Sequence, residues 1–482
     1  MSFLVFHDTI GACTTMRSSS EYAAGSVPAT CIFTAVLGGQ NHSNSGAYSS
    51  ILMGNGNSIG FIPDACNTFH TIENGDHNFI CSAIANSINN GVSNSITCSN
   101  YSIINNGLTN GISQSNMSII QTGNGNHIYE NNFDHNKGYN TISNGYFHHI
   151  CNSSTQSFIS NGDLNGIDGH IGNFILNGNE QCICYNLCQS DYNYIGNGNG
   201  NYILATAFNV IGNGNCNIIS DNTLYSRETL YSTISNGCCN SISGNYNIIA
   251  NGICNTLSSY SSSIFNGNSN QISSPYSTIS GGCCNIIDVY SEHSFINSGF
   301  CNQICGNSHY ASIYSGGGNI IDQSSCYSAI FSGSTHKIDQ NVTFGSIING
   351  TCNFICSGSN FSQISGGHHN TISGKYSSVL NGNSNTASGA YASILGGANN
   401  HATGSHSVIL GGSGNTDSGY ANVFIAGTGI TAVAAGTLHI NNLWIAPTTY
   451  CTYAGCAPTL TFPKGTVYVD TFTGGLPLRI AP

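Results

Sequence analysis

The sequence predicts an all-β fold, a parallel β-solenoid of about 23 coils with repeats of 15–17 residues, on three observations. Glycines recur at a constant interval near the carboxyl end, where Gly389, Gly404 and Gly419 are each 15 residues apart. An asparagine anchor and an aromatic phrase alternate along the chain in step with these glycines. Charged residues are only 5% of the chain, yet 39% are hydrophobic, with 25 Tyr and 21 Phe, so the composition argues against disorder.

The anchor of each repeat is an asparagine followed two residues later by an apolar or small residue, as in "NTISG" at Asn370. Most anchors lie 15 to 17 residues apart, and His336 fills one missing place. The anchors that we expect to form a structural ladder are Asn240, Asn255, Asn270, Asn285, Asn302, Asn319, Asn353, Asn370, Asn385, Asn400 and Asn415. Towards the amino terminus the same position is filled by Asn217, Asn201, Gln181, Asn165, His148, Asn126, Asn110, Asn94, Asn78, Asn57 and Asn41.

Between two anchors lies a second phrase, in which an aromatic residue is followed by two mostly small residues and then by Ile or Val. It reads "YSTISGG" from Tyr276 and "YASILGG" from Tyr391. Each repeat therefore holds two short runs of strand-forming residues separated by glycine or Asn-Gly turns. This pattern indicates two strands per coil.

Parallel stacking of such coils aligns equivalent side chains in ladders. We expect the Ile of the second phrase to form a buried apolar ladder and the aromatic residue three positions earlier to form another. The recurring asparagine is expected to form a side-chain amide ladder, donating to one neighbour and accepting from the other. Coils that repeat every 4.8 Å or so would give a rod of roughly 110 Å.

Several strands are apolar on both faces, although successive residues of a strand point to opposite sides. Examples are the pairs Ile347–Ile348, Ile394–Leu395 and Ile409–Leu410. One side can fill the coil's own interior, and the other needs cover. Burial between identical subunits is the favoured answer, and a wide single-chain coil is the alternative.

The two ends depart from the repeat and are expected to be caps. Residues 1–30 are assigned to an amino-terminal cap or anchor, residues 31–427 to the solenoid, and residues 428–482 to a carboxy-terminal β cap. In the last segment, the alternation of "TVYVD", the turn in "TFTGG" and the strand-like "LPLRIAP" suggest a hairpin.

Charge and targeting signals limit the partners. Seven Lys and Arg against 19 Asp and Glu give a formal net charge of −12, so nucleic acid is not an expected partner. The start "MSFLVFHDTIGACTTMRSSS" lacks a secretory pattern, and no run of apolar residues is long enough to span a bilayer. We expect synthesis in a cytoplasm and a final location on a virion surface or outside a cell, without membrane insertion.

The 22 cysteines show no zinc-type spacing, and the densest group, Cys182, Cys184 and Cys188, is interpreted as packing cysteines rather than a metal site. Cys239 and Cys254 each precede an anchor in consecutive coils, as do Cys284 and Cys301. In register, each pair would lie about 4.8 Å apart, within the range that a disulfide permits. These four are therefore predicted to form inter-coil disulfides or stacked thiols.

No catalytic residue, metal site or cofactor is predicted. The histidine pairs "FHHI" (His148, His149) and "GGHHN" (His368, His369) are assigned to the anchor ladder or to turns rather than to catalysis.

The enzymatic alternative is a trimeric tailspike-like protein that binds or cleaves glycans, which would need two nearby carboxylates. Asp163 with Asp168, or Asp288 with Asp322, are the candidate pairs. Exposed Tyr and Asn would suit a carbohydrate-binding surface without cleavage.

The phrase "GxYSxIxGGxxNxAxG" resembles the head repeat of trimeric autotransporter adhesins, the YadA-like or Hep_Hag repeat. The similarity is closest from about Gly374 to Gly427, in "SGKYSSVLNGNSNTASGAYASILGGANNHATGSHSVILGG". It implies a left-handed β-roll, a homotrimer and a binding surface held away from a particle or cell. The longer coils and many cysteines look like fibre proteins of large DNA viruses or phages.

From this resemblance we expect a structural fibre for attachment or surface decoration. Its expected partners are further copies of itself, including higher fibre assembly, and a host-surface glycan or receptor.

Overall fold

The computed structural model describes residues 4–7, 15–18, 34–60, 69–82, 84–130, 138–152, 154–169, 171–184, 191–204, 207–220, 231–441, 467–469 and 478–480. The chain divides into two compact units, Met1–Ile440 and Asn441–Pro482. No helix occurs in the described ranges, so none of their segments is a helix that could cross a membrane.

In the first unit, each regular coil contributes one short strand to each of two sheets, which we call sheet A and sheet B. Sheet A contains β1 (Leu4–His7), β2 (Thr15–Ser18), β3 (Thr34–Val36), β5 (Ser50–Ile51), β7 (Thr71–Ile72), β9 (Ser87–Ile88), β11 (Ile103–Ile104), β13 (Ile119–Ile120), β15 (Thr141–Ile142), β17 (Phe158–Asp163), β19 (Phe174–Asn179), β21 (Tyr194–Asn199), β23 (Val210–Asn215), β25 (Thr233–Ile234), β27 (Ile248–Ile249), β29 (Ser263–Ile264), β31 (Thr278–Ile279), β33 (Phe295–Ile296), β35 (Ser312–Ile313), β37 (Ala329–Ile330), β39 (Ser346–Ile347), β41 (Gln363–Ile364), β43 (Ser378–Val379), β45 (Ser393–Ile394), β47 (Val408–Ile409), β48 (Phe424–Ala426) and β49 (Leu438–Ile440).

Sheet B contains β4 (Ser43–Asn44), β6 (Ser58–Ile59), β8 (Phe79–Cys81), β10 (Ser95–Thr97), β12 (Gly111–Ser113), β14 (His127–Tyr129), β16 (His149–Cys151), β18 (Gly166–Asp168), β20 (Cys182–Ile183), β22 (Tyr202–Leu204), β24 (Ile218–Ser220), β26 (Ser241–Ser243), β28 (Thr256–Leu257), β30 (Gln271–Ile272), β32 (Ile286–Ile287), β34 (Gln303–Ile304), β36 (Ile320–Ile321), β38 (Lys337–Ile338), β40 (Phe354–Ile355), β42 (Thr371–Ile372), β44 (Thr386–Ala387) and β46 (His401–Ala402).

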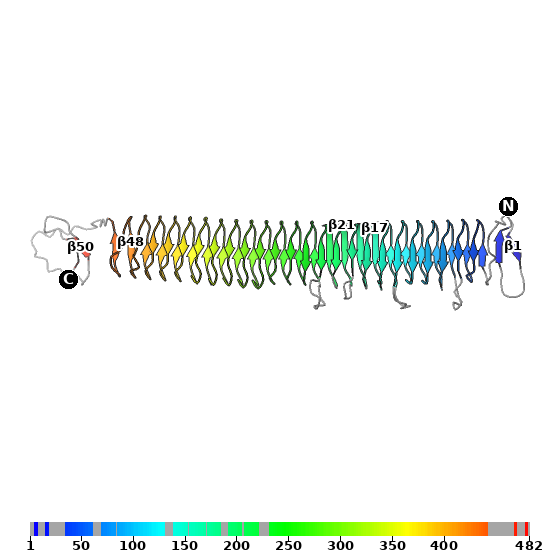
Figure 1. The fold of residues 1–482 in the computed structure, drawn as a ribbon, viewed down its shortest axis with the longest axis horizontal. Helices are drawn as coiled ribbons and strands as arrows, with labels where there is room; N and C mark the ends of the chain where they lie inside the picture. The colour runs from blue at the N-terminus through cyan, green and yellow to red at the C-terminus, as the bar shows by residue number, and fades with distance from the viewer. Residues whose placement is uncertain are drawn as a thin grey trace, which may run out of the picture. The chain divides into compact units, whose positions relative to one another are not determined.

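Every strand from β5 to β47 pairs in parallel with the equivalent strand of the neighbouring coil. In sheet A, for example, Ile279 of β31 aligns with Ile264 before it and Ile296 after it. The same register holds in sheet B, where β32 pairs with β30 and β34. The predicted parallel β-solenoid of about 23 coils is therefore confirmed, and Figure 1 shows its coils following one another in chain order.

The interior is filled by two apolar columns, one from each sheet. The second residue of the typical two-residue strand points inward, and these isoleucines are 0–1% exposed along the described coils. Leu257, Ala387 and Ala402 substitute for Ile in sheet B. Full burial of such a side chain is worth about 1.5–3 kcal/mol, so the columns are the main source of stability.

A glycine three residues before each anchor lets the chain turn towards the next strand. Along this column from Gly39 to Gly412 the φ angles lie between +79° and +139°, which side chains with a Cβ rarely adopt. A Cβ on Gly252 would lie 2.2 Å from the carbonyl oxygen of Gly267 and 2.4 Å from the side-chain nitrogen Nδ2 of Asn255. The absent side chain therefore makes room both for the next coil and for the anchor.

The ends differ from the regular coils. At the amino-terminal side β1 pairs antiparallel with β2, which pairs in parallel with β3. At the other side β48 pairs in parallel with β49, so sheet A continues past Gly427 to Ile440. In the second unit β50 (Val467–Val469) pairs antiparallel with β51 (Leu478–Ile480).

Candidate functional site

The anchor side chains tie each coil to the next. The side-chain oxygen of Asn240 accepts a hydrogen bond from the backbone N–H of Asn255 at 3.0 Å, and the amide nitrogen of Asn255 donates to the Gly267 carbonyl, also at 3.0 Å. The Asn255 amide also lies 3.1 Å from the Asn240 oxygen. The same arrangement recurs through Asn415, so most of the ladder's bonds join a side chain to the backbone.

Histidine fills the anchor position where its ring nitrogen can replace the amide oxygen. Nδ1 of His336 accepts the N–H of Asn353 at 3.1 Å, and Nδ1 of His148 accepts that of Asn165 at 3.2 Å. Burial lowers the pKa of both rings, which keeps them neutral and able to accept. The first anchor was predicted one residue too early, because Asn41 is exposed and the buried His42 accepts from Asn57.

A second polar ladder, which the sequence reasoning missed, lies at the start of the sheet A strands. The hydroxyl of Ser262 accepts the N–H of Ser277 at 3.2 Å and donates to the Ser274 carbonyl at 2.9 Å. In other coils an asparagine takes this position, and the side-chain oxygen of Asn193 accepts the backbone N–H of Asn209 at 3.0 Å. Its sequence signal is the small residue directly after the aromatic position.

The aromatic residues form a ladder as predicted, but the expectation that this ladder is buried is wrong. Tyr310, Tyr327, Phe344 and Phe361 stack with ring centroids 5.0 Å apart, while about half of each side chain is exposed. The complete run is Tyr276, His293, Tyr310, Tyr327, Phe344, Phe361, Tyr376, Tyr391 and His406. Because each inner ring is covered on both faces by its neighbours, only the ring edges are available to a ligand.

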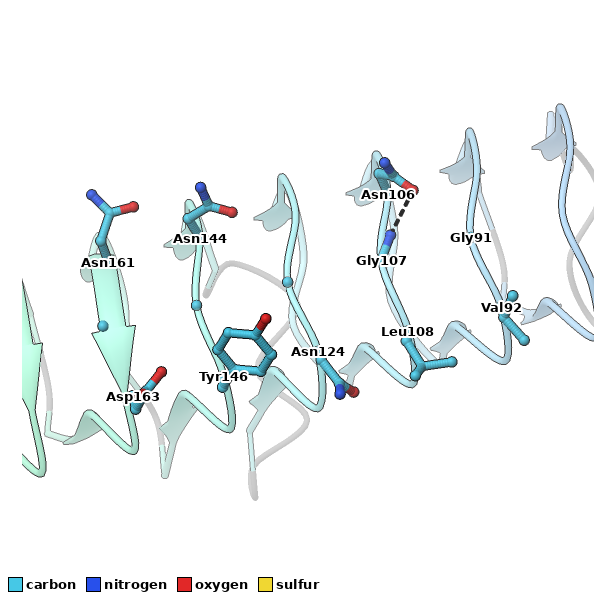
Figure 2. Close-up of a pocket in the computed structure, with 13 residues that line it drawn as sticks. Gly91, Val92, Asn106, Gly107, Leu108, Asn124, Asn144, Tyr146, Asn161 and Asp163 are labelled. Atoms are coloured by element: carbon cyan, nitrogen blue, oxygen red, sulfur yellow. Dashed lines mark hydrogen bonds between the residues drawn. The ribbon is translucent and has the colours of Figure 1, made fainter.

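An open groove of about 780 Å³ runs across the turns of consecutive coils (Figure 2). The lining includes five glycines of the turn column: Gly91, Gly107, Gly123, Gly145 and Gly162. One rim carries the amides of Asn106, Asn144 and Asn161. The opposite rim carries Val92, Leu108, Asn124, Tyr146 and Asp163.

The turn sequence Asn-Gly builds this groove locally. The backbone N–H of Gly107 donates to the side-chain oxygen of Asn106 at 2.8 Å, shown dashed in Figure 2. From Asn161 onward the rim amides bond to one another, beginning with Asn161 to Asn177 at 3.0 Å and Asn177 to Asn197 at 2.9 Å. Amide groups, one exposed tyrosine and a single carboxylate suit an uncharged polar ligand such as a glycan.

Neither candidate carboxylate pair occupies equivalent positions of adjacent coils. The register partners of Asp163 are Tyr146 and Asn179, and that of Asp168 is Cys151. The column that holds Asp288 passes through Cys305 before it reaches Asp322, a separation of two coils or about 9.6 Å.

Asp322 and Asp339 do occupy equivalent positions of adjacent coils, and Lys337 joins them at 2.9 and 3.0 Å. Burial alone would raise the pKa of Asp322, but the hydrogen bond from Lys337 reverses this and lowers it. An ionised, lysine-bound carboxylate is poorly suited to act as a general acid.

The described cysteines lie on the outer surface of the coils rather than in the interior. Cys182 and Cys184 point the same way from the β20 region and their sulfur atoms are in contact; Cys188 lies outside the described residues. Cys239, Cys254, Cys284 and Cys301 are free thiols in the structure. Within each "CC" pair the sulfur atoms lie 3.1 Å apart.

Two thiols near acidic groups are poor nucleophiles. Burial, with a smaller effect of Asp168, raises the pKa of Cys151 to about 11. Burial, with the charges of Asp322 and Asp288, does the same for Cys305. Since the thiolate is the reactive form, neither side chain is activated at neutral pH.

Comparison with protein-family models finds no match to the chain, and comparison with curated proteins finds none.

Proposed function

We propose that this chain is a structural fibre protein whose coil stack serves as a scaffold for attachment or for decoration of a virion or cell surface. The observation that carries the proposal is the unbroken parallel register from β5 to β47, with one isoleucine-type column inside each sheet. Every regular coil repeats the same hydrogen bonds and the same core. Such a repeat supplies length and rigidity rather than one assembled site.

The proposed assembly is a homotrimer, and an apolar stripe on the outer face of sheet A supports it. Tyr314, Phe331 and Ile348 occupy one position in consecutive coils, each 37–42% exposed. After Ser365 the stripe continues through Leu380, Leu395 and Leu410, at 38–44% exposed. Contiguous exposed apolar surface of this kind is typical of protein interfaces.

The resemblance to YadA-like head repeats and to fibres of large DNA viruses or phages supports the same assignment. In that family the repeat holds a binding surface at a distance. We place the ligand-binding role on the outer turns and at the ends of the stack, with a host-surface glycan or receptor as the partner.

Electron microscopy of the purified protein tests the fibre proposal directly. We expect rods that contain about 110 Å of coil stack, from roughly 23 coils at about 4.8 Å each. Gold-labelled antibody against the protein is expected to decorate the outside of particles or cells. A globular monomer would overturn the proposal.

A second candidate function is a tailspike-like glycan-binding or glycan-cleaving protein, and the groove in Figure 2 favours it. Its amide rim, Tyr146 and Asp163 could hold a sugar chain along the stack. Incubation with host polysaccharides and assay of new reducing ends separates the two functions. Activity that is lost in Asp163→Asn would establish the enzyme and reject the purely structural assignment.

A further inference from the structure

Three side chains with metal-binding atoms meet on the outside of two consecutive coils. The ligand atoms of Cys352, His368 and His369 all lie within 4.8 Å of one another. Cys352 is partly buried and both histidines are exposed, so the group is open to solvent. None of the three belongs to the groove or to the anchor ladder.

The backbone register creates this group. Cys352 and His369 occupy the same position of adjacent coils, 17 residues apart, and His368 precedes His369 in the turn. The N–H of His369 donates to the Thr351 carbonyl at 3.1 Å, and that of Cys352 donates to the Ser334 carbonyl at 3.0 Å. Because the coil ladder holds these backbone positions, only side-chain rotation is needed to gather the three ligand atoms.

Two neighbouring side chains contact the potential ligands. Nδ1 of His368 lies 3.4 Å from the side-chain oxygen of Asn383, and the tautomer with its proton on Nδ1 would share that proton with this oxygen and leave the lone pair on Nε2. The hydroxyl of Thr335 donates to the Ser334 carbonyl at 2.7 Å and lies 3.0 Å from the sulfur of Cys352, so it accepts from the thiol and would have to rotate to donate to a thiolate. Hydrogen bonds to the far side of ligating groups are a regular feature of metal sites.

We propose that Cys352, His368 and His369 bind one divalent cation of the Zn²⁺ type, with water in the fourth position. One thiolate and two imidazoles suit this borderline-soft ion. Ligand distances of about 2.3 Å to sulfur and 2.0–2.1 Å to nitrogen put the ligand atoms of such a tetrahedral site roughly 3.3–3.6 Å apart. The present group reaches that spacing by a small closure of exposed side chains.

The ion would connect two adjacent coils at the turn edge and stabilise them by binding only the folded arrangement. The cysteine column at Cys239 and Cys254 has no histidine in the equivalent coils and serves as an internal comparison. This inference is independent of the proposed fibre function, because it concerns a local ion site.

The test measures Zn²⁺ binding to the reduced, metal-free full chain by equilibrium dialysis, and Co²⁺ binding by its thiolate charge-transfer and visible bands. The variants are Cys352→Ser, His369→Ser and His368→Asn. The chain already carries Ser at the first two positions in other coils, at Ser269 and Ser384, and Asn at the third, at Asn268 and Asn383. Folding is therefore expected to be unaffected, and circular dichroism checks it.

Each variant is expected to lose one bound equivalent, with affinity at that site reduced at least about 10-fold. The matched controls Cys254→Ser and His406→Ser are expected to keep it. The proposal is overturned if the three variants bind as the wild type does, if the loss follows Cys254→Ser instead, or if Cys352→Ser alone loses the ion while both histidine variants retain it.

Discussion

In each coil, the glycine three residues before the anchor and the anchor itself act as one unit. The glycine has a positive φ and no side chain, and the anchor amide occupies the space beside it. The spacing Gly-x-x-anchor also identifies the register: Gly39 lies three residues before His42, and Gly333 three before His336. This spacing would have placed the first anchor correctly.

Replacing one glycine of this column tests the unit. In Gly397→Ala, the new Cβ would lie 2.0 Å from the Gly412 carbonyl oxygen and 2.6 Å from the side-chain nitrogen Nδ2 of Asn400. The φ angle of residue 397 is +90°, which alanine rarely adopts. We expect a local loss of about 1–3 kcal/mol or more, since strained backbone alone costs that much. Native-state hydrogen exchange at the Asn400 coil measures the free energy of local unfolding.

The adjacent Gly396 provides the control, because nothing lies within 4 Å of a Cβ built there. Gly396→Ala is expected to change stability by no more than about 0.5 kcal/mol. Equal effects of the two substitutions would contradict this account of the glycine column.

The buried anchor histidines make stability depend on pH. Burial lowers the pKa of His336 below 6.5 in the folded state, so the unfolded chain binds more protons as the pH falls. This contribution to stability is complete above about pH 6.5 and is lost as the pH drops towards the folded pKa. We expect the backbone N–H of Asn353 to exchange its hydrogen faster in the wild type than in His336→Asn at pH 5. At pH 8 the two proteins are expected to exchange it at similar rates.

The coil around Asn285, whose neighbouring anchors are Asn270 and Asn302, should show no difference between these two proteins. If His336→Asn does not slow exchange at pH 5, protonation of the ring is not the cause.

For the strands, the sequence predicted which residues stack but not always which face of the sheet they occupy. The spacing of three between Tyr376 and Val379 is odd, so period-two alternation puts the two side chains on opposite faces. Counting inward from Val379 places Ser377 inside and Tyr376 outside, as observed. The same alternation therefore predicts both that the aromatic ladder is exposed and that the serine ladder is buried.

Removing one ring tests the aromatic ladder. Phe361→Ser deletes two stacked contacts, to Phe344 and Tyr376, each worth about 0.5–1.5 kcal/mol. We expect a local loss of about 1–3 kcal/mol in hydrogen exchange of the flanking coils, and the αL position tolerates serine, as Ser261 shows. Phe300→Ser, at an exposed turn position outside this ladder and outside the sheet A stripe, should have a smaller effect.

The cysteine columns predict pairwise oxidation. Cys239 and Cys254, and likewise Cys284 and Cys301, are free in the structure and one coil apart. Without reductant, freshly purified protein should be alkylated at all four sites. After mild oxidation, peptide mapping should show Cys239 linked to Cys254 and Cys284 linked to Cys301, because about 4.8 Å per coil fits a disulfide. Links within the "CC" pairs instead would show that the closer sulfur contact decides the pairing.

The period of the sequence repeat alone was sufficient to predict the coils of the molecule, because in a parallel stack every repeat packs against its neighbours in the same way. The cluster of Cys352, His368 and His369 was beyond sequence reasoning, since its members meet only through the 17-residue coil step. "GGHHN" shows two of the ligands, and the third lies one coil away. The groove at Gly91 to Asp163 likewise depends on side chains from five coils.

The apolar stripe on sheet A is expected to mediate assembly of identical subunits. Leu395 and Leu410 are 38% and 42% exposed in the single chain, so association of identical subunits would remove them from water. We expect the wild type to be trimeric by light scattering after size exclusion, and the double variant Leu395→Glu, Leu410→Glu to be monomeric, because buried unpaired charge disfavours the interface. Thr386→Glu, on the outer face of sheet B, should leave the trimer intact. A wild-type monomer, or a trimer that survives the double substitution, would move the interface away from this stripe.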